Sequence, residues 1–497
     1  MVVGLLNGSS LLAMLCVAPF MQQPLMTLVR NAVIYWYLCT NPLVYLAVDS
    51  CLRQEVQCAG YVSGPVVDYF RRQNGYLVTV AARHPDRIPD KEDDFLTKVV
   101  LNVERDAALL GQLVRAHELV ISFVPYALHP IVARLCIEHG RHMVTSSYLL
   151  PQMLQLDARA KAAGVTVMTE SGLDPGIDHL LAAECFDDVR DRGGKVESFK
   201  SYCGGLPAPE HAHNPIRYKF SWTPKGVLMA KKNAAKYLWE GRLRETPPGE
   251  SVLDGRFDLD FMPQLGFEAY PNRDSTLYIE PYGIQDASTV FRGTLRYKGY
   301  AQIMSCLNRL DLFSDETDKT LAERSGPLTW KAFLTSVLAK KLGKPVDSAA
   351  DALRELLGVD EATVDALEGL GLCSDSALVA ESAGTALDAL SAHLGSRLAF
   401  APGERDLVVL HHDIRARFPD GRRERHRISL MAYGQTDGFS AMAQTVGYTA
   451  AIVARLILEG RIPEKGMLRP LRKNVYEPTL KQLSELGITV SRHVVQE

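Results

Sequence analysis

The chain has 497 residues, of which 47% are hydrophobic and 23% are charged, and its formal net charge is −3. This composition is typical of globular proteins, and the length is enough for roughly three domains of about 150 residues each. The nearly balanced charge argues against nucleic acid or an anionic membrane as a partner. The nine cysteines form no C-x-x-C pair, which favours reduced thiols, and no histidine spacing predicts a metal site.

Residues 1–53 form an atypical apolar segment. The run "TLVRNAVIYWYLCTNPLVYLAV" is long enough to span a membrane, but Arg30, Asn31, Asn41 and Pro42 interrupt it, so no membrane span is expected. We interpret the segment as a remnant of an upstream domain or a wrongly assigned start, and it predicts no chemistry.

From about residue 54, predicted strands alternate with predicted helices. Strands are expected at 53–57, 77–82, 119–124 and near 143, which predicts βαβ units in a Rossmann-type, doubly wound parallel sheet. Such sheets bind ligands at the carboxyl ends of their strands.

Two positions in this region suggest a dinucleotide. The turn "CAGYVS" (58–63) keeps only the middle glycine, Gly60, of the G-x-G-x-x-G fingerprint, so a plain helix-capping turn is an equal alternative. Arg83 ends the second strand, where an arginine selects the 2′-phosphate of NADP. A solvated surface charge is the alternative for Arg83.

The stretch "TVMTESGLDPGIDHLLA" (166–182) passes from an apolar strand through a turn into a helix. Asp174 precedes a proline that suits a first helical position, so we expect Asp174 to cap a helix that begins at Pro175.

The later part of the chain contains two further patterns. Residues 311–397 show apolar residues at helical spacing with glycine stops, which predicts an inserted all-helical domain. Residues 405–434 alternate and turn at Asp420–Gly421, which predicts a hairpin at the edge of a second, mixed sheet. A long apolar helix is expected over 439–460.

Several long motifs carry a resemblance to a known family. They are "GLDPGIDH" (172–179), "SYCGGLPAPEHAHNPIRYKFSW" (201–222), "YPNRDST" (270–276), "RGTLRYKGY" (292–300) and "GFSAMAQTVG" (438–447). Together they resemble the glutamate-forming saccharopine dehydrogenase family, and most closely the C-terminal half of the bifunctional alpha-aminoadipic semialdehyde synthases. The resemblance runs from about residue 55 to the C-terminus.

The resemblance implies a fold in which one domain is interrupted by the others. We expect a Rossmann domain (54–150 plus 435–475), an α/β substrate domain with a mixed sheet (151–310 plus 398–434) and the helical insertion (311–397). The implied activity is the reversible oxidation of L-saccharopine, a step of lysine metabolism, to L-glutamate and 2-aminoadipate 6-semialdehyde.

The cofactor implied is NADP, with NAD as the alternative. Two other functions stay open: a related imine reductase such as carboxynorspermidine dehydrogenase, and a non-enzymatic descendant with a decayed cofactor site. A cytoplasmic location is expected, with the mitochondrial matrix as the alternative, and a homodimer is left open.

Site residues follow where the motifs match. Cofactor contacts are implied for Gly60, Tyr61, Val62, Ser63, Ala82, Arg83, Asn102, Val103, Ile121, Ser146, Leu173, Asp174, Pro175 and Thr223. Substrate contacts are implied for Phe123, Val124, Ser147, Tyr148, Asp174, Arg217, Arg273, Thr294 and Arg296. Cys58 and Asn102 depart from the family's glycine and aspartate, which puts cofactor affinity in doubt.

The chemistry of saccharopine agrees with the arginines. Its three carboxylates call for several arginines, because the guanidinium binds a carboxylate through two parallel hydrogen bonds. Arg217, Arg273, Arg292 and Arg296 all occupy stretches that read as loops. Tyr148, Asp174, Cys203 and a bound water are candidates for moving the amine proton, and we assign the catalytic role to Asp174 and Tyr148.

Overall fold

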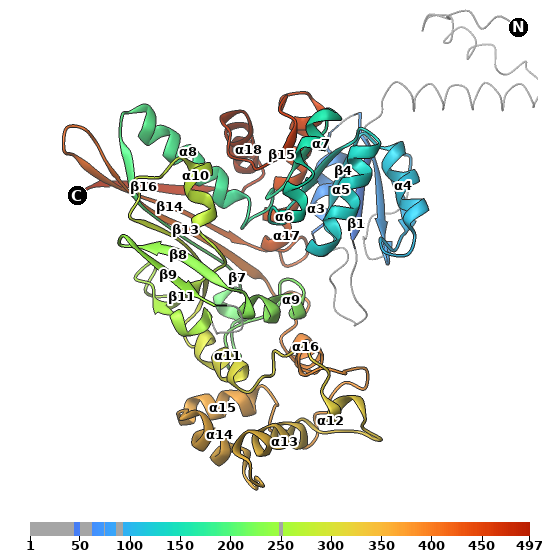
Figure 1. Cartoon of the computed structure of the whole chain (residues 1–497), viewed down its shortest axis with the longest axis vertical. Helices are drawn as coiled ribbons and strands as arrows, with labels where there is room; N and C mark the ends of the chain where they lie inside the picture. The colour runs from blue at the N-terminus through green and yellow to red at the C-terminus, as the bar shows by residue number, and fades with distance from the viewer. Residues whose placement is uncertain (1–43, 50–61, 74, 86–92, 248–251) are drawn as a thin grey trace, which may run out of the picture.

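The computed structural model describes residues 44–49, 62–73, 75–85, 93–247 and 252–497. Figure 1 shows two sheet-containing parts side by side at the top and a group of helices below them.

The first sheet has seven strands, all parallel, in the order β3-β2-β1-β4-β5-β6-β15. This confirms the predicted Rossmann-type doubly wound sheet. β2 and β3 follow on one side of β1, and β4 and the later strands follow on its other side. The strands are β1 (Val44–Asp49), β2 (Leu77–Ala82), β3 (Leu96–Val100), β4 (Leu119–Ser122), β5 (His142–Thr145), β6 (Thr166–Met168) and β15 (Gly466–Leu468).

The position of the first strand differs from the sequence prediction. The strand was expected at 53–57, which lies outside the described residues, whereas the structure forms β1 at Val44–Asp49, hydrogen-bonded between β2 and β4. The apolar run "VYLAVD" therefore belongs to the parallel sheet instead of preceding it. A central parallel strand is covered on both faces, so a continuous apolar run suits it better than a polar one.

Helices cover both faces of this sheet. One apolar core contains residues of α4, α5, α6 and α7, and another contains residues of α3, α8, α17 and α18. Of the helices in the described parts of the chain, α17 alone is long and apolar enough to cross a membrane by length and composition, and 72% of it is buried inside the protein. The helices are α3 (Gly64–Arg71), α4 (Ala107–Ala116), α5 (His129–Glu138), α6 (Pro151–Leu154), α7 (Asp157–Ala162), α8 (Ile177–Asp191), α17 (Ala441–Leu458) and α18 (Lys473–Glu485).

The second sheet is mixed, as predicted, with the main order β10-β11-β12-β7-β13-β14-β16 and with β8 and β9 branching from β12. The predicted hairpin is formed by β13 and β14, but it does not lie at the sheet edge, because β16 pairs with β14 beyond it. The strands are β7 (Lys195–Pro207), β8 (Ala235–Trp239), β9 (Arg242–Thr246), β10 (Phe257–Asp258), β11 (Phe267–Pro271), β12 (Thr289–Tyr297), β13 (Asp406–Arg417), β14 (Arg423–Tyr433) and β16 (Val490–Gln496), with helices α9 (Pro224–Met229), α10 (Ile279–Tyr282) and α11 (Tyr300–Arg309).

The lowest part in Figure 1 is helical, as predicted. Its helices are α12 (Lys319–Ala322), α13 (Trp330–Leu342), α14 (Ala349–Leu357), α15 (Glu361–Gly369) and α16 (Ala386–Arg397). Thr329, Ser348 and Thr385 cap the N-termini of α13, α14 and α16 through their side chains, and Gly343 and Gly358 end α13 and α14 in the left-handed conformation.

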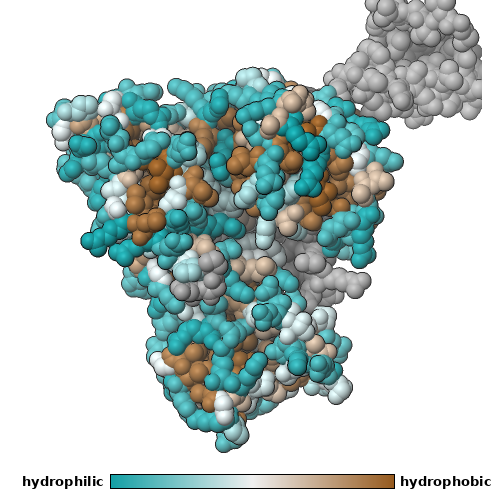
Figure 2. Space-filling model, viewed as in Figure 1, coloured by the Kyte–Doolittle hydropathy of each residue, from teal (hydrophilic) through white to brown (hydrophobic). Residues whose placement is uncertain are grey.

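The two sheets and the helical part share their cores. The apolar cluster around α8 and α17 includes residues from both sheets, and the cluster of the helical part includes residues of β11 and α11. Figure 2 shows hydrophilic residues around the rim of the visible face, with apolar residues gathered between them. These shared cores hold the carboxyl edge of the first sheet against the second sheet.

Candidate active site between the two sheets

The predicted cofactor residues gather at the carboxyl edge of the parallel sheet. Ala82 ends β2, Ile121 lies in β4, and Ser146 follows β5, while Ser63 occupies the N-cap position of α3. Ala82, Val103 and Ile121 are buried, and Asn102 follows β3. Val62 directly precedes Ser63, and Gly60 and Tyr61 lie outside the described residues. Thr223 precedes α9 and is exposed.

Arg83 stands at the end of β2, where the second ribose of a dinucleotide reaches a Rossmann sheet. Its Nη2 lies 3.2 Å from Glu104 Oε2, and the Glu104 side chain is 55% exposed. Exposed ion pairs add little to the stability of a protein, so a bound phosphate can displace the Glu104 carboxylate from Arg83 with a small loss of stability. The residues at this edge therefore fit a phosphorylated nicotinamide dinucleotide, and Arg83 with the start of α3 would hold its phosphates.

The loop between β6 and α8 brings Asp174 to the second sheet. Arg292 of β12 places Nη2 2.5 Å from Asp174 Oδ1 and 2.5 Å from Asp178 Oδ2. The Tyr148 hydroxyl donates a hydrogen bond to Asp174 Oδ1 at 3.3 Å. Asp178 and Arg292 are buried, whereas 13% of the Asp174 side chain stays exposed, which makes Asp174 the member of the group that a ligand can reach.

Asp174 does not cap the helix, contrary to the sequence prediction. The loop closes on itself: Gly172 N–H donates to Pro175 O, and Ile177 N–H donates to Gly172 O. Helix α8 therefore begins at Ile177, with Gly176 as its N-cap. Gly176 has φ +151°, and a Cβ there would lie 2.0 Å from Gly172 O, so only glycine fits this turn. The loop leaves the Asp174 carboxylate to Arg292 and Tyr148.

The pKa values of the two aspartates move in opposite directions. Burial and the nearby Asp178 carboxylate raise the pKa of Asp174, although Arg292 opposes them. For Asp178, burial raises the pKa, but His179, Arg292 and the Gly176 N–H together outweigh it and lower the pKa. Of the two carboxylates on the Arg292 guanidinium, that of Asp174 has the less stabilised charged form, which suits a group that exchanges a proton with an amine.

Two other proton-transfer candidates hold their protons. Burial and the Asp174 carboxylate raise the pKa of the Tyr148 hydroxyl well above its usual value. Burial and the same carboxylate raise the pKa of the Cys203 thiol well above its usual value. Both groups therefore stay neutral at physiological pH, and Tyr148 acts as a hydrogen-bond donor to Asp174.

The predicted substrate arginines do not all reach this group. Arg273 places its guanidinium carbon 4.5 Å from the centre of the Tyr148 ring and has φ +55°, an uncommon conformation found at functional sites. Arg292 and Arg296 lie in strand β12 and are buried, not in loops as expected. Arg217 stacks 4.2 Å from the ring of Tyr297, a residue of the apolar cluster on the opposite face of the sheet.

The remaining predicted contacts surround the same edge. Thr294 lies on the face of β12 that carries Arg292, because side chains two residues apart share a face. Phe123 and Val124 follow β4, and Leu173 is buried beside Asp174. Ser147 Oγ lies 2.7 Å from Nε2 of the buried His129, whose pKa burial lowers to about 3.

Sequence reasoning missed Glu170. Its carboxylate is buried, accepts hydrogen bonds from Leu149 N–H at 2.9 Å and Arg469 Nε at 3.0 Å, and lies 2.7 Å from His179 Nε2. Burial raises its pKa, but His179, Arg469 and the Leu149 N–H lower it to about 2. The only signal in the sequence is an acidic residue directly after an apolar strand, which also fits an ordinary surface turn.

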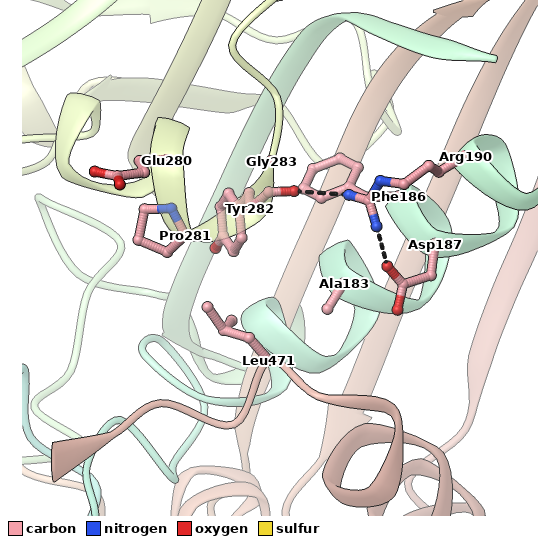
Figure 3. Close-up of a pocket in the computed structure, with 9 residues that line it drawn as sticks. All are labelled: Ala183, Phe186, Asp187, Arg190, Glu280, Pro281, Tyr282, Gly283 and Leu471. Carbon is pink, nitrogen blue, oxygen red and sulfur yellow. Dashed lines mark hydrogen bonds and ion pairs between the residues drawn. The ribbon is translucent and has the colours of Figure 1, made fainter. Parts of the chain in front are cut away.

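A small pocket of about 170 Å³ lies between α8 and α10, next to the contacts of Glu170 and His179 (Figure 3). Arg190 bridges it by donating to the Tyr282 carbonyl at 3.1 Å and to Asp187 at 2.5 Å. Tyr282, which also lines the pocket, lies with its hydroxyl 2.6 Å from His179 Nδ1. Because Arg190 and Asp187 already satisfy each other, we assign no ligand to this pocket.

Comparison with known proteins gives consistent matches. The family model "Saccharopine dehydrogenase NADP binding domain" matches residues 58–168, and "Saccharopine dehydrogenase C-terminal domain" matches residues 172–488. A mouse alpha-aminoadipic semialdehyde synthase is 41% identical over 89% of this chain and 48% of its own length, so the chain spans about half the length of that relative.

Two further relatives match over nearly their whole length. The NADP(+)-dependent, L-glutamate-forming saccharopine dehydrogenase of Pyricularia oryzae is 38% identical over 88% of this chain and 98% of its own. The solved apo structure of the L-glutamate-forming enzyme from Saccharomyces cerevisiae aligns with a TM-score of 0.78 and 34% identity, covering 91% of this chain and 100% of that one.

Proposed function

This chain belongs to the saccharopine dehydrogenase family, and from that premise we propose that it catalyses the reversible NADP-dependent oxidation of L-saccharopine to L-glutamate and 2-aminoadipate 6-semialdehyde. The observation that carries the proposal is the Asp174–Arg292–Asp178 group at the carboxyl edge of a parallel sheet whose second strand is followed directly by Arg83. It combines a site for a cationic amine with a site for a phosphorylated dinucleotide.

The amine of saccharopine is protonated near neutral pH, so it must lose a proton before hydride can leave the adjacent carbon. Asp174 accepts this proton, since its raised pKa makes it a stronger base than an exposed aspartate. NADP+, when bound, supplies the hydride acceptor. Asp178 stays ionised and keeps Arg292 in place.

The second half of the reaction is hydrolysis. Water adds to the carbon of the C=N bond, the C–N bond breaks, and the nitrogen leaves with glutamate. Asp174 returns the proton that the departing nitrogen needs, and Tyr148 holds the carboxylate by its hydrogen bond. Arg273, stacked on Tyr148, is placed to bind a substrate carboxylate.

The test is formation of reduced nicotinamide by purified protein given L-saccharopine, with NADP+ and NAD+ in parallel. We expect turnover with a higher kcat/KM for NADP+, and an Arg83→Ala variant should lose most of this preference while it keeps turnover with NAD+. Carboxynorspermidine, which carries fewer carboxylates, serves as the competing substrate. No turnover of saccharopine with either cofactor would contradict the proposal.

The compartment and the oligomeric state stay predictions. The mouse relative is named mitochondrial, and for this chain both the cytoplasm and the mitochondrial matrix are compatible with the proposed chemistry. Fractionation of the source cells and light scattering of the purified protein decide these two points.

A further inference from the structure

A buried histidine lies in the first turn of α8, directly after Asp178, and the proposed mechanism does not use it. His179 has no exposed surface. Its Nε2 lies 2.7 Å from Glu170 Oε2, and its Nδ1 lies 2.6 Å from the Tyr282 hydroxyl and 3.8 Å from Asp178 Oδ2. The imidazole ring therefore lies between two buried carboxylates.

The contact with Glu170 places a proton on Nε2. Glu170 is ionised, because it accepts the Leu149 N–H and pairs with the Arg469 guanidinium. A bare Nε2 would hold its lone pair 2.7 Å from a carboxylate oxygen, and the two electron pairs would repel each other. Nε2 makes no directed hydrogen bond with any residue that the structure describes, so charge holds the ring against the carboxylate.

The charges of this buried network balance only if the His179 ring is charged as well. Three carboxylates and two guanidinium groups form its other ion pairs: Glu170, Asp174, Asp178, Arg292 and Arg469. Buried charges are paired as a rule, because an unpaired one is costly. An imidazolium at His179 brings the sum to zero, and its Nδ1–H then donates to the Tyr282 hydroxyl.

We propose that His179 is a positioning residue of the reaction: as an imidazolium beside Asp178, it keeps Asp178 ionised and so reserves Asp174 to take the proton of the substrate amine. This inference rests on the proposed function, because it explains how the same site directs its proton. His179 acts through Asp178 and needs no contact with the substrate.

The direction of the proton matters because the two aspartates share one guanidinium. Arg292 Nη2 lies 2.5 Å from an oxygen of each, and carboxylates this close take up protons as a pair. A proton on Asp178 is out of reach of a ligand, since Asp178 has no exposed surface, whereas 13% of the Asp174 side chain is exposed. A positive charge 3.8 Å from Asp178 favours the state in which Asp174 takes the proton.

The pKa values of both aspartates agree with this bias. Burial raises the pKa of Asp178, and His179 comes first among the charges that lower it, ahead of Arg292. Burial also raises the pKa of Asp174, but there Arg292 comes first among the charges that lower it and His179 follows. The imidazolium therefore stabilises the charged form of Asp178 more than that of Asp174.

The other titratable groups around the ring do not change charge near neutral pH. Burial raises the pKa of the hydroxyls of Tyr278 and Tyr282, so both keep their protons. On β13, His412 places Nε2 3.1 Å from the Asp178 carbonyl oxygen, and burial lowers its pKa to about 4. The two guanidinium groups stay charged. A change in activity with pH at this site therefore reports the aspartate pair.

The experiment compares His179→Gln with His117→Gln in the full-length chain. Glutamine keeps a polar donor beside Glu170 but carries no charge. His117 is buried as well, but it precedes β4, at the edge of the parallel sheet opposite to the aspartates, so it controls for loss of a buried histidine.

The pH dependence of kcat/KM for L-saccharopine is the first readout. Without the imidazolium the aspartates protonate more easily, so in His179→Gln we expect the acid limb to move to higher pH by about one unit, while kcat above that limb stays within about threefold. His117→Gln should leave the acid limb where it is. A merely structural role would lower activity equally at every pH.

NMR of the ring nitrogens measures the charge without turnover. In protein with isotope-labelled histidine, the signals that His179→Gln removes should show a proton on both ring nitrogens at about pH 8, above the usual histidine pKa of about 6.5. A ring with one bare nitrogen at that pH would overturn the proposal. His179→Asn, which keeps an amide toward Tyr282, replaces the glutamine variant if that one does not fold.

The outcomes separate the two proposals. If the unchanged protein oxidises saccharopine and the acid limb of His179→Gln does not move, the role of His179 is wrong while the proposed function stands. If the unchanged protein does not oxidise saccharopine, the proposed function fails, and the NMR signals still decide whether the buried ring is charged.

Discussion

Asp174 and Asp178 share the Arg292 guanidinium, yet only Asp174 is suited to exchange a proton. Asp178 is completely buried and accepts the Gly176 N–H at 2.6 Å, so its charged form is stabilised from two sides. Burial and the neighbouring carboxylate disfavour the charged form of Asp174, and its side chain remains partly exposed. We therefore propose that Asp178 positions the guanidinium and that Asp174 exchanges the proton.

Replacement of Asp174 by asparagine tests this division. The amide cannot accept the amine proton, so kcat should fall about 100-fold or more. In the unchanged protein, activity should rise with pH through the raised pKa of Asp174, above the usual value of 3.8, and the variant should lose this rise. Steady-state kinetics across pH measure both effects, with Asp191→Asn, on the exposed end of α8, as the control. An unchanged pH profile would remove Asp174 from the proton transfer.

At the scale of elements, Glu170 joins three strand ends. It follows β6 with φ +58°, binds the chain after β5 through Leu149 N–H and binds the chain after β15 through Arg469. Tyr148 directly precedes Leu149, so Glu170 fixes the segment that carries the Tyr148 hydroxyl. It acts through other residues and does not contact Asp174.

Glu170→Gln should therefore lower the free energy of unfolding in a pH-dependent way. A pKa lowered from 4.5 to about 2 corresponds to about 3 kcal/mol. Because the folded-state pKa is depressed, this stability is present above pH 4.5 and is lost as the pH falls toward 2. Urea unfolding at several pH values should show a flatter profile for the variant in that window. Glu138→Gln, at the exposed end of α5, is the control, and parallel profiles for all three proteins would contradict the assignment.

Much of the element pattern could be predicted, because apolar periodicity and helix caps are local. The strand at 77–82 and the helices that begin after Thr329, Ser348 and Thr385 follow from a few neighbouring residues. The pairing of Asp174 with Arg292 could not, since it depends on a loop closed on Gly172 and on a strand more than 100 residues away. A local reading of Asp-Pro indicates a helix cap, and only the tertiary contact shows otherwise.

At the scale of the whole molecule, the helical insertion is not an independent body. Trp330 and Leu390 of the insertion belong to the same apolar cluster as Tyr270 and Tyr300 of the second sheet region. Separation of the insertion would therefore expose apolar residues of the second sheet region. We expect the two parts to unfold together.

Urea unfolding followed by two signals tests this coupling. Fluorescence of the fully buried Trp330 reports the insertion, and circular dichroism reports the whole chain; the two transitions should superimpose, as they do in cooperative unfolding. Trp330→Phe identifies the part of the fluorescence that belongs to this residue. A fluorescence transition at lower urea than the circular dichroism transition would show that the insertion unfolds by itself.

The pairing of residues 166 and 466 in neighbouring strands has a consequence for synthesis on the ribosome. The edge strand β15 follows β6 at a long distance in the chain, so at about 5 to 20 residues per second β6 waits about 15 to 60 s for β15. During that time β6 is an uncovered sheet edge, which is a hazard for aggregation. Until β15 is made, the backbone N–H and C=O groups along this edge of β6 are open to pairing with another chain.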